Sequence, residues 1–286
     1  MIITVPTSPN YATVSFTLNR NIAASRSVFT NRQRTQEYDG CYWTAQVTLP
    51  PMQRADALEW TTFLTRLQGV KNTFLLGDPS HTTNSGTYND DHLATENRVN
   101  DTSETLTFTA SSSTITAGTS IFTNTFAGDF IVVSGATNDD NNGTFKVTTK
   151  TSATAVVVDR TLVDESSTAN CKVRQNIKGA TGLSLTRVGS GAGTIKKGDY
   201  LAILDAAATT GDPVQYVMVV EDATASSTDY GVRIEPKLRA DITAGHYVKF
   251  ATPKGQFRLA SNQVSWSVNQ ASIYGLSFTA VEVING

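Results

Sequence analysis

The stretch CYWTAQVTLPPMQRADALEWTTFLTRLQGVKNTFLLGDP (41–79) decides the fold of the first part of the chain. From Cys41 to Leu49 apolar and polar side chains alternate, which predicts a strand with one buried face and one polar face. Pro50 and Pro51 then end the strand and open a helix, because proline is tolerated in the first helical turn.

One helix is predicted, over about residues 51–68. Four apolar residues at the spacing i, i+3, i+4 and i+7 form a single stripe along it: Trp60, Phe63, Leu64 and Leu67. Gly69 is a typical residue for the end of a helix. The strand TFLL (73–76) follows and Gly77-Asp78-Pro79 ends it, so this part of the chain has the order strand, helix, strand.

The composition favours β structure in the rest of the chain. Of the 286 residues 39% are hydrophobic and 17% charged, and Thr, Ser, Asn and Gly take the remaining share. Threonine favours strands, while asparagine and glycine favour turns. The net charge of -2 without a basic block excludes nucleic-acid binding driven by phosphate neutralisation.

Nothing in the sequence predicts membrane insertion or secretion. There is no run of about 18 apolar residues, and the N-terminal sequence lacks the charged region and the apolar run of a secretory signal. The two cysteines, Cys41 and Cys171, could pair, but without a secretory signal we expect two reduced thiols.

The chain divides into a platform and inserted modules. The polar segment His81–Thr105 predicts a linker or a long exposed loop. The strands expected in 255–283 are inferred to return and pair with the N-terminal strands, so the middle is an insertion. We place the boundaries as follows: a discontinuous β platform with one helix in 1–84 and 250–286, an inserted β module in 85–175 and a second β module in 176–249.

A weak internal repeat predicts that the two modules share one plan. GDFIVVSG (128–135) resembles GDYLAILD (198–205), and AVVVDRTLVDE (155–165) resembles GVRIEPKLRAD (231–241). Each copy has Gly-Asp, an aromatic residue and an aliphatic strand, followed later by a second strand. We therefore predict a mainly β protein with two small β-barrel or sandwich modules.

Two clusters contain residue types that occur in catalytic or metal-binding sites. Asp78, Ser80 and His81 lie within four positions of one turn, whereas triad members usually come from separate elements, so we expect a solvated turn. Asp90, Asp91, His92 and Glu96 lack any metal-binding spacing, so we expect a charged linker there.

Two loops resemble ligand-binding loops only in part. NDDNNG (138–143) resembles the start of a calcium loop through Asn138, Asp140, Asn142 and Gly143. Residue 149, where that loop needs an acid, is threonine, so we predict a hairpin turn and leave calcium as a minor alternative. GSGAGTIKKGD (189–199) lacks the Gly-Lys-Ser/Thr ending of a phosphate-binding loop.

The remaining candidates are isolated acids and aromatic residues. Asp129, Asp199 and Glu235 lie beside strand starts or turns, where acids usually cap the backbone or remain solvated. The tryptophans at 43, 60 and 266 could stack on sugars, but each lies on a predicted buried stripe, so we expect core packing. We therefore predict no catalytic, cofactor-binding or metal site and assign no ligand-binding residue.

Several segments resemble one family of viral proteins. WTTFLTRLQGVKNTFLLGDP (60–79), GDYLAIL, IEPKLR, PKGQFRLASNQVSWSV and YGLSFTAVEV are similar to parts of the distal tail protein of long-tailed bacteriophages, a tail-tip or baseplate hub component. The resemblance covers roughly 1–80 and 176–286. It implies a β platform with a helix that assembles into a six-fold ring at the end of the tail tube, and a peripheral β domain that holds receptor-binding parts.

The resemblance sets the functional expectation. It implies a structural virion protein of the tail tip that joins the tail tube to the host-recognition apparatus, without enzymatic activity or a cofactor. The implied partners are other copies in a homohexamer, the tail tube protein and hub or fibre proteins. Assembly would occur in the host cytoplasm, and DNA would only pass through the lumen, which polar faces rich in Thr, Ser and Asn suit.

One departure from the family and two alternatives remain. Family members have one β domain after the ring domain, whereas two modules here precede the returning strands. The main alternative is a carbohydrate-binding module of a phage tail that recognises a host surface glycan, with Tyr88 or Tyr230 as an exposed stacking residue. A glycan-degrading enzyme has the least support.

Overall fold

We describe a computed structural model of the chain, which covers residues 1–38, 40–88, 90, 92–99, 103–188, 193–206, 208, 211–225 and 228–284. Two compact units divide the chain. The platform unit comprises Met1–Ser80, Pro213–Tyr216 and Lys254–Gly286, and the barrel unit comprises His81–Asp212 and Val217–Pro253. The regular structure of the described residues consists almost entirely of β-strands, with one α-helix, so the prediction of a mainly β fold is confirmed.

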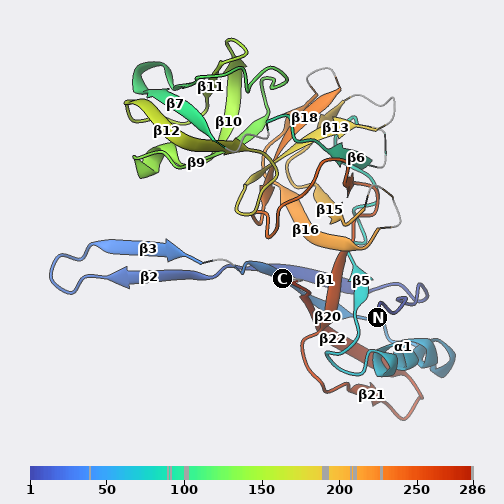
Figure 1. Cartoon of the computed structure of the whole chain (residues 1–286). Coiled ribbons are helices and arrows are strands. Elements are labelled where there is room, and N and C mark those ends of the chain that lie inside the picture. The colour runs from blue at the N-terminus through green and yellow to red at the C-terminus, as the bar shows by residue number, and fades with distance from the viewer. Residues whose placement is uncertain are drawn as a thin grey trace. The chain divides into compact units, whose positions relative to one another are not determined.

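One sheet, built from strands near both ends of the chain, lies at the centre of the platform unit (Figure 1). Its strands follow one another as β1 (Thr13–Asn19), β4 (Tyr42–Thr48), β22 (Tyr274–Glu282), β20 (Gly255–Leu259) and β5 (Phe74–Leu76), and β21 (Trp266–Val268) pairs with β22. The antiparallel pairs β22–β4 and β20–β5 join the C-terminal strands to the N-terminal ones. The prediction that the C-terminal strands return to the N-terminal strands is therefore confirmed.

The predicted alternation decides which face of the sheet is buried. All five apolar residues of the pattern are buried: Cys41, Trp43, Ala45, Val47 and Leu49. Helix α1 (Arg54–Arg66) belongs to the same core, since the ring of Phe63 lies edge-on against Phe74 at 5.5 Å and Phe74 lies against Phe278 at 6.0 Å. The predicted helical stripe is confirmed, because its four residues are all buried.

Helix α1 is shorter than the predicted range of 51–68. It begins at Arg54, because Gln53 is extended and Met52 forms a bridge with Tyr274 of β22. At its other end Gln68 and Gly69 both have positive φ angles, of 52° and 67°. A Cβ on Gly69 would lie 2.5 Å from Asn262 Oδ1, so glycine is required there by both conformation and space.

The barrel unit contains two closed six-stranded barrels. The first barrel is made of β7 (Glu104–Thr109), β8 (Thr114–Ala117), β9 (Phe130–Ser134), β10 (Gly143–Lys150), β11 (Ala155–Val158) and β12 (Glu165–Arg174). The second barrel is made of β6 (His92–Thr95), β13 (Gly182–Arg187), β15 (Tyr200–Leu204), β16 (Pro213–Val219), β18 (Asp229–Glu235) and β19 (Tyr247–Lys249). Short strands β14 (Thr194–Ile195) and β17 (Ala223–Thr224) pair separately.

The two barrels have the same topology. With the strands of each barrel numbered in chain order, both close as 1-2-5-4-3-6. The first barrel lies in the chain between β6 and β13, which are strands one and two of the second barrel. The first barrel is thus an insertion in the second, which is itself inserted in the platform sequence.

The Gly-Asp repeat of the sequence marks equivalent positions of the two barrels. Gly128 donates its N–H to the carbonyl of Val147 at 2.7 Å, and Gly198 donates to that of Val219 at 2.8 Å. Both glycines have positive φ angles, of 103° and 93°. The prediction of two modules with one plan is confirmed, because the repeat falls on strand three of each barrel.

The backbones of the two barrels approach each other closely. A Cβ on Gly182 would lie 2.2 Å from Cγ of Phe130, and a Cβ on Gly231 would lie 1.6 Å from the carbonyl oxygen of Gly128. No larger side chain fits at either glycine without movement of the neighbouring atoms.

The prediction of a linker or exposed loop over 81–105 is wrong for part of that segment. β6 (His92–Thr95) pairs with both β13 and β19, and Leu93 and Ala94 are buried. The segment is polar, so its sequence lacks the apolar run that usually signals a strand; two neighbouring strands supply its partners instead.

Candidate assembly surface

A two-stranded arm, defined here as residues 22–37, leaves the platform sheet (Figure 1). Its strands β2 (Ile22–Arg26) and β3 (Gln33–Glu37) pair with each other alone among the described residues, and all ten strand residues are exposed. The arm continues the β1–β4 ribbon beyond a break at Gly40, whose φ angle is 110°. A two-stranded ribbon without further neighbours is only marginally stable in water, so a contact with another surface would stabilise this arm.

The tip of the arm carries two bare apolar side chains. Val28 is 91% exposed and Phe29 is 98% exposed. The turn that presents them is ordered by hydrogen bonds, since Ser27 donates to the carbonyl of Arg32 and Asn31 donates to that of Ser27, both at 2.9 Å. A fixed turn with an exposed aromatic ring is typical of a contact surface.

Exposed apolar side chains concentrate on the platform unit. Among the described residues, the large hydrophobic residues that are exposed all belong to this unit except Val163 and Val188. The platform members are Met1, Ile22, Val28, Phe29, Tyr38, Leu58, Val70, Trp266, Val268 and Ile284. The platform is therefore the part of the chain best suited to contacts with other proteins.

The face of the sheet opposite α1 is polar and nearly uncharged. The pairing registers place one set of neutral residues there: Thr13, Ser15, Thr17, Tyr42, Thr44, Gln46, Thr48, Ser277 and Thr279. Within β1, β4, β22 and β20 the one charged side chain on this face is Arg258, which the register places beside Val281. Such a face offers hydrogen bonds without the charge that would hold a phosphate backbone.

One edge of the sheet is open. β1 pairs with β4, and within the described part of the chain no strand pairs with its other edge. Unpaired N–H and C=O groups on an edge strand are a template for another strand.

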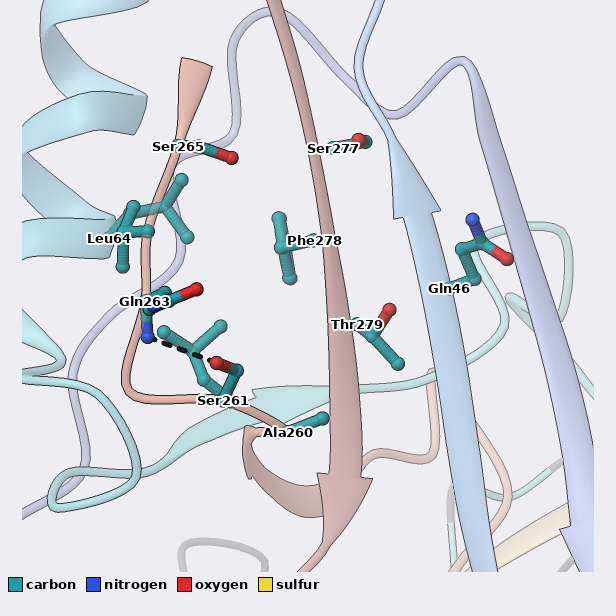
Figure 2. Close-up of a pocket in the computed structure, with 11 residues that line it drawn as sticks. Gln46, Leu64, Ala260, Ser261, Gln263, Ser265, Ser277, Phe278 and Thr279 are labelled. Carbon is teal, nitrogen blue, oxygen red and sulfur yellow. Dashed lines mark hydrogen bonds between the residues drawn. The ribbon is translucent and has the colours of Figure 1, made fainter.

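A small pocket lies beside β22 (Figure 2). β21 pairs with the start of β22 and β20 with its end, and the loop 260–265 spans the gap between them. The cavity measures about 200 Å³, and none of its lining residues is ionisable. Figure 2 shows Leu64, Gln263 and Ser265 on one side of the strand and Gln46 on the other. This pocket can bind through neutral hydrogen bonds, and its own side chains supply no acid or base.

The expectation of a solvated turn holds for Ser80, which lies in an exposed turn, but is wrong for His81, which is buried. Asp78 Oδ1 accepts hydrogen bonds from the backbone N–H of Ser80 at 2.8 Å and from its hydroxyl at 2.6 Å. His81 lies instead near Asp199, with 4.0 Å between Nδ1 and Oδ1. The serine hydroxyl is thus turned to the aspartate, and the arrangement does not activate it as a nucleophile.

The second candidate cluster is only partly described, because Asp91 lies outside the described residues. The ring of His92 stacks on Tyr247 with 4.2 Å between centroids. In the described ranges no three His, Cys, Asp or Glu side chains are grouped so that they could hold a metal ion. Of the glycine-rich stretch 189–199, residues 189–192 lie outside the described residues.

The loop 138–143 is a hairpin turn, as predicted. It connects the antiparallel strands β9 and β10 through a short 3₁₀ helix (Asp139–Asn141). A residue that the sequence analysis missed, Glu165, organises this turn. Its carboxylate accepts hydrogen bonds from the N–H groups of Thr137 and Asn138 at 2.7 and 3.2 Å. The side chains of Asn141 and Thr168 donate to it at 2.9 and 2.5 Å.

Replacing Glu165 by glutamine is expected to destabilise the first barrel at neutral pH by about 1–2 kcal/mol, because a carboxylate holds these donors more strongly. Burial opposes ionisation, but the hydrogen bonds outweigh it and lower the pKa of Glu165 from 4.5 to about 2. The extra stability of the wild type is thus present above pH 4.5 and is lost as the pH falls toward 2. Urea unfolding at several pH values measures it.

Asp140→Asn is the matched control for that prediction. Asp140 lies in the same turn and is exposed, and its carboxylate accepts none of these four hydrogen bonds. A Glu165→Gln effect no larger than that of the control, or one independent of pH, would contradict the role of Glu165.

The two Gly-Asp acids, Asp129 and Asp199, are buried and cap backbone groups, which is the first of the two roles expected for them. Asp129 Oδ1 accepts from the N–H of Phe130 at 3.1 Å and from the hydroxyl of Ser184. Asp199 accepts from the N–H groups of Ser85 at 2.9 Å and Lys196 at 3.1 Å. Burial raises the pKa of Asp129, although Arg98 and the hydrogen bonds oppose this rise. Glu235, the third acid, ends β18 and is half-buried.

Several expectations about aromatic residues need correction. Trp43 and Trp60 are buried, as predicted, but Trp266 is 46% exposed, because β21 lies at the margin of the sheet and nothing in the described chain covers it. Tyr88 and Tyr230, expected to be exposed, are buried in the core of the second barrel with their rings 5.4 Å apart. Burial raises the pKa of both phenols.

Neither Cys41 nor Cys171 forms a disulfide, and both are buried, as expected for reduced thiols. Within the described ranges, no helix has the length and apolar character needed to cross a lipid bilayer. Comparison of the chain with protein-family models and with curated proteins found no match.

Proposed function

We propose that this chain is a structural virion protein of a phage tail tip, which assembles into a ring that joins the tail tube to the host-recognition apparatus. The observation that carries the proposal is the arm, a fully exposed two-stranded ribbon with a bare phenylalanine at its tip. Such a surface is unfavourable in an isolated monomer and becomes an interface in an assembly.

Two further properties of the platform support a ring. The open edge of β1 offers main-chain hydrogen bonds to a neighbouring copy. The uncharged face of the sheet suits a lumen through which DNA passes, because neutral hydroxyl and amide groups do not retain phosphates as a basic surface would. In this proposal the partners are other copies in a homohexamer, the tail tube protein and hub or fibre proteins, and the protein acts without catalysis.

The mass of the purified protein by light scattering, followed by negative-stain imaging, tests the proposal. We expect a closed ring with a central hole, or a ring that closes when isolated tail tubes are added. A protein that stays monomeric at high concentration and does not bind tail tubes would contradict the proposal.

Glycan binding has no specific observation in its favour. The two tyrosines considered as sugar-stacking residues, Tyr88 and Tyr230, are buried, so a sugar could reach them only after the second barrel opened. Trp266 is exposed, but it is one of several exposed apolar residues of the platform unit, most of them aliphatic. Its exposure therefore does not point to sugar stacking in particular. We therefore retain assembly as the proposed function.

A further inference from the structure

We infer that the tip of the arm docks on a second copy of this chain, in a depression beside helix α1. The inference rests on the proposed function and names one interface of the assembly. Its starting point is Phe29, whose side chain is left uncovered by the described part of its own chain. An aromatic side chain buries about 150–250 Å² when it enters a pocket, so burial of this ring supplies a large part of a contact.

The depression lies between the first residues of the chain and the outer surface of α1. Its volume is about 460 Å³, which accommodates a phenyl ring together with the neighbouring Val28. Val5, Pro6, Leu58 and Phe63 give it apolar walls, and Leu58 is 52% exposed although it lies in the middle of the helix. The other four lining residues, Thr4, Glu59, Thr62 and Arg66, are polar or charged, so the exposed leucine and its apolar neighbours form one side that is suited to receive an apolar side chain.

The two surfaces lie at opposite ends of the platform unit. In Figure 1 the arm extends away from the sheet on one side, whereas α1 lies on the other side. The tip therefore cannot reach the depression of its own chain. A contact between two different patches of identical chains is heterologous, and such contacts form rings when the rotation closes.

Charge complementarity at this pairing is local. Arg26 and Arg32 lie on either side of the tip in the sequence. On α1, Asp56 and Glu59 are about one helical turn apart, and Glu59 lines the depression. Arg66 also lines the depression, so an arginine of the tip is placed best at Glu59, away from Arg66.

Disulfide trapping between two differently tagged variants, each with one added cysteine, tests the contact. Val28→Cys, which keeps the Phe29 ring, and Leu58→Cys are mixed with oxidised glutathione, and the mixed disulfide is measured on a non-reducing gel. The matched control pairs Val28→Cys with Val163→Cys, which also replaces an exposed aliphatic residue but lies in the barrel unit. The native cysteines are buried and react slowly.

We expect about tenfold more of the first mixed disulfide than of the control, because only the docked pair holds the two Cβ atoms close enough for a bond. Equal yields would overturn the inference. So would binding to vesicles of phosphatidylethanolamine and phosphatidylglycerol that depends on Phe29, without the specific disulfide, since the arm would then address a membrane.

A second variant separates this interface from the proposed function. Phe29→Ser is not expected to affect folding, because the side chain is exposed, and it should weaken self-association about 10- to 100-fold. Phe29→Tyr should retain most of it. If the Phe29→Ser variant forms rings as stable as those of the wild type, the docking of the tip is wrong, whereas the proposal that the protein forms a ring still stands. Failure of the wild type to assemble, alone or on tail tubes, would contradict the proposed function itself.

Discussion

Replacing Arg98 by alanine is expected to lower the free energy of unfolding of the barrel unit by about 3–5 kcal/mol, because it leaves a buried carboxyl group without its cation. The Arg98 side chain is 5% exposed and lies between the two barrels. Its Nη2 is 2.7 Å from Asp229 Oδ1 and donates to the carbonyl of Leu185 at 3.0 Å. Its Nη1 is 3.6 Å from Asp129 Oδ1.

The pH dependence of this variant has a definite sign. Burial already raises the pKa of Asp129 above 3.8, and Arg98 opposes that rise. Without the guanidinium the pKa in the folded state is higher still, whereas the unfolded state is unchanged. The destabilisation should therefore be smallest at low pH, where the carboxyl is protonated in both states. It should grow as the pH rises through the folded-state pKa of Asp129 in the wild type, which lies above 3.8.

Urea unfolding of the variant at several pH values measures this effect, and two further variants serve as controls. Lys146→Ala removes an ion pair with Glu221, which also joins the two barrels but lies at the surface, and it should cost about 1 kcal/mol or less. Adding Asp129→Asn to Arg98→Ala should recover part of the loss, since the neutral amide needs no cation. Equal costs for Arg98→Ala and Lys146→Ala would contradict a buried ion pair.

Periodicity was sufficient to predict the core of the platform. The alternation from Cys41 to Leu49 has the period of a strand with one apolar face, and the stripe through Trp60 has the period of a helix with one apolar face. The apolar residues of both patterns are buried. The Gly-Asp repeat at Gly128 and Gly198 likewise predicted two similar modules, because each glycine takes a positive φ angle at the same place in its barrel.

The candidate assembly surface was less predictable, for a physical reason. The residues 22–37 show no alternation that distinguishes a buried face, because neither face of the arm is buried. Whether Trp266 or Tyr230 is exposed depends on which strands cover it, and strand neighbours are long-range contacts that a local pattern does not report. The nesting of one barrel within the other has the same origin, since β6 lies far from β13 in the sequence.

Excision of the first barrel is expected to leave the platform and the second barrel folded. The variant lacks residues 98–175 and joins Asn97 to Asn176 through a short Gly-Ser linker. These two residues are already neighbours, because Asn176 Nδ2 is 3.1 Å from Asn97 Oδ1 and also donates to the carbonyl of Glu96 at 3.0 Å. A short linker can therefore close the chain without moving β6.

The two barrels have separate core clusters, although Val132 of β9 packs against the second one, and this separation is the main reason for that expectation. Phe108, Phe145 and Cys171 belong to the core of the first barrel, whereas Tyr230 belongs to the core of the second. Excision removes none of the six strands of the second barrel. Asp229 loses Arg98, but its side chain is 27% exposed, so water can hydrate it.

Far-UV circular dichroism and thermal unfolding measure the outcome, and we expect a cooperative transition for the excised protein. Deletion of 143–174 alone is the control: it removes β10, β11 and β12, opens the first barrel and exposes its core, so it should aggregate. Aggregation of both variants would show that the second barrel needs the first. A folded excised protein that still self-associates would place assembly in the platform, because the arm and α1 are unchanged in it.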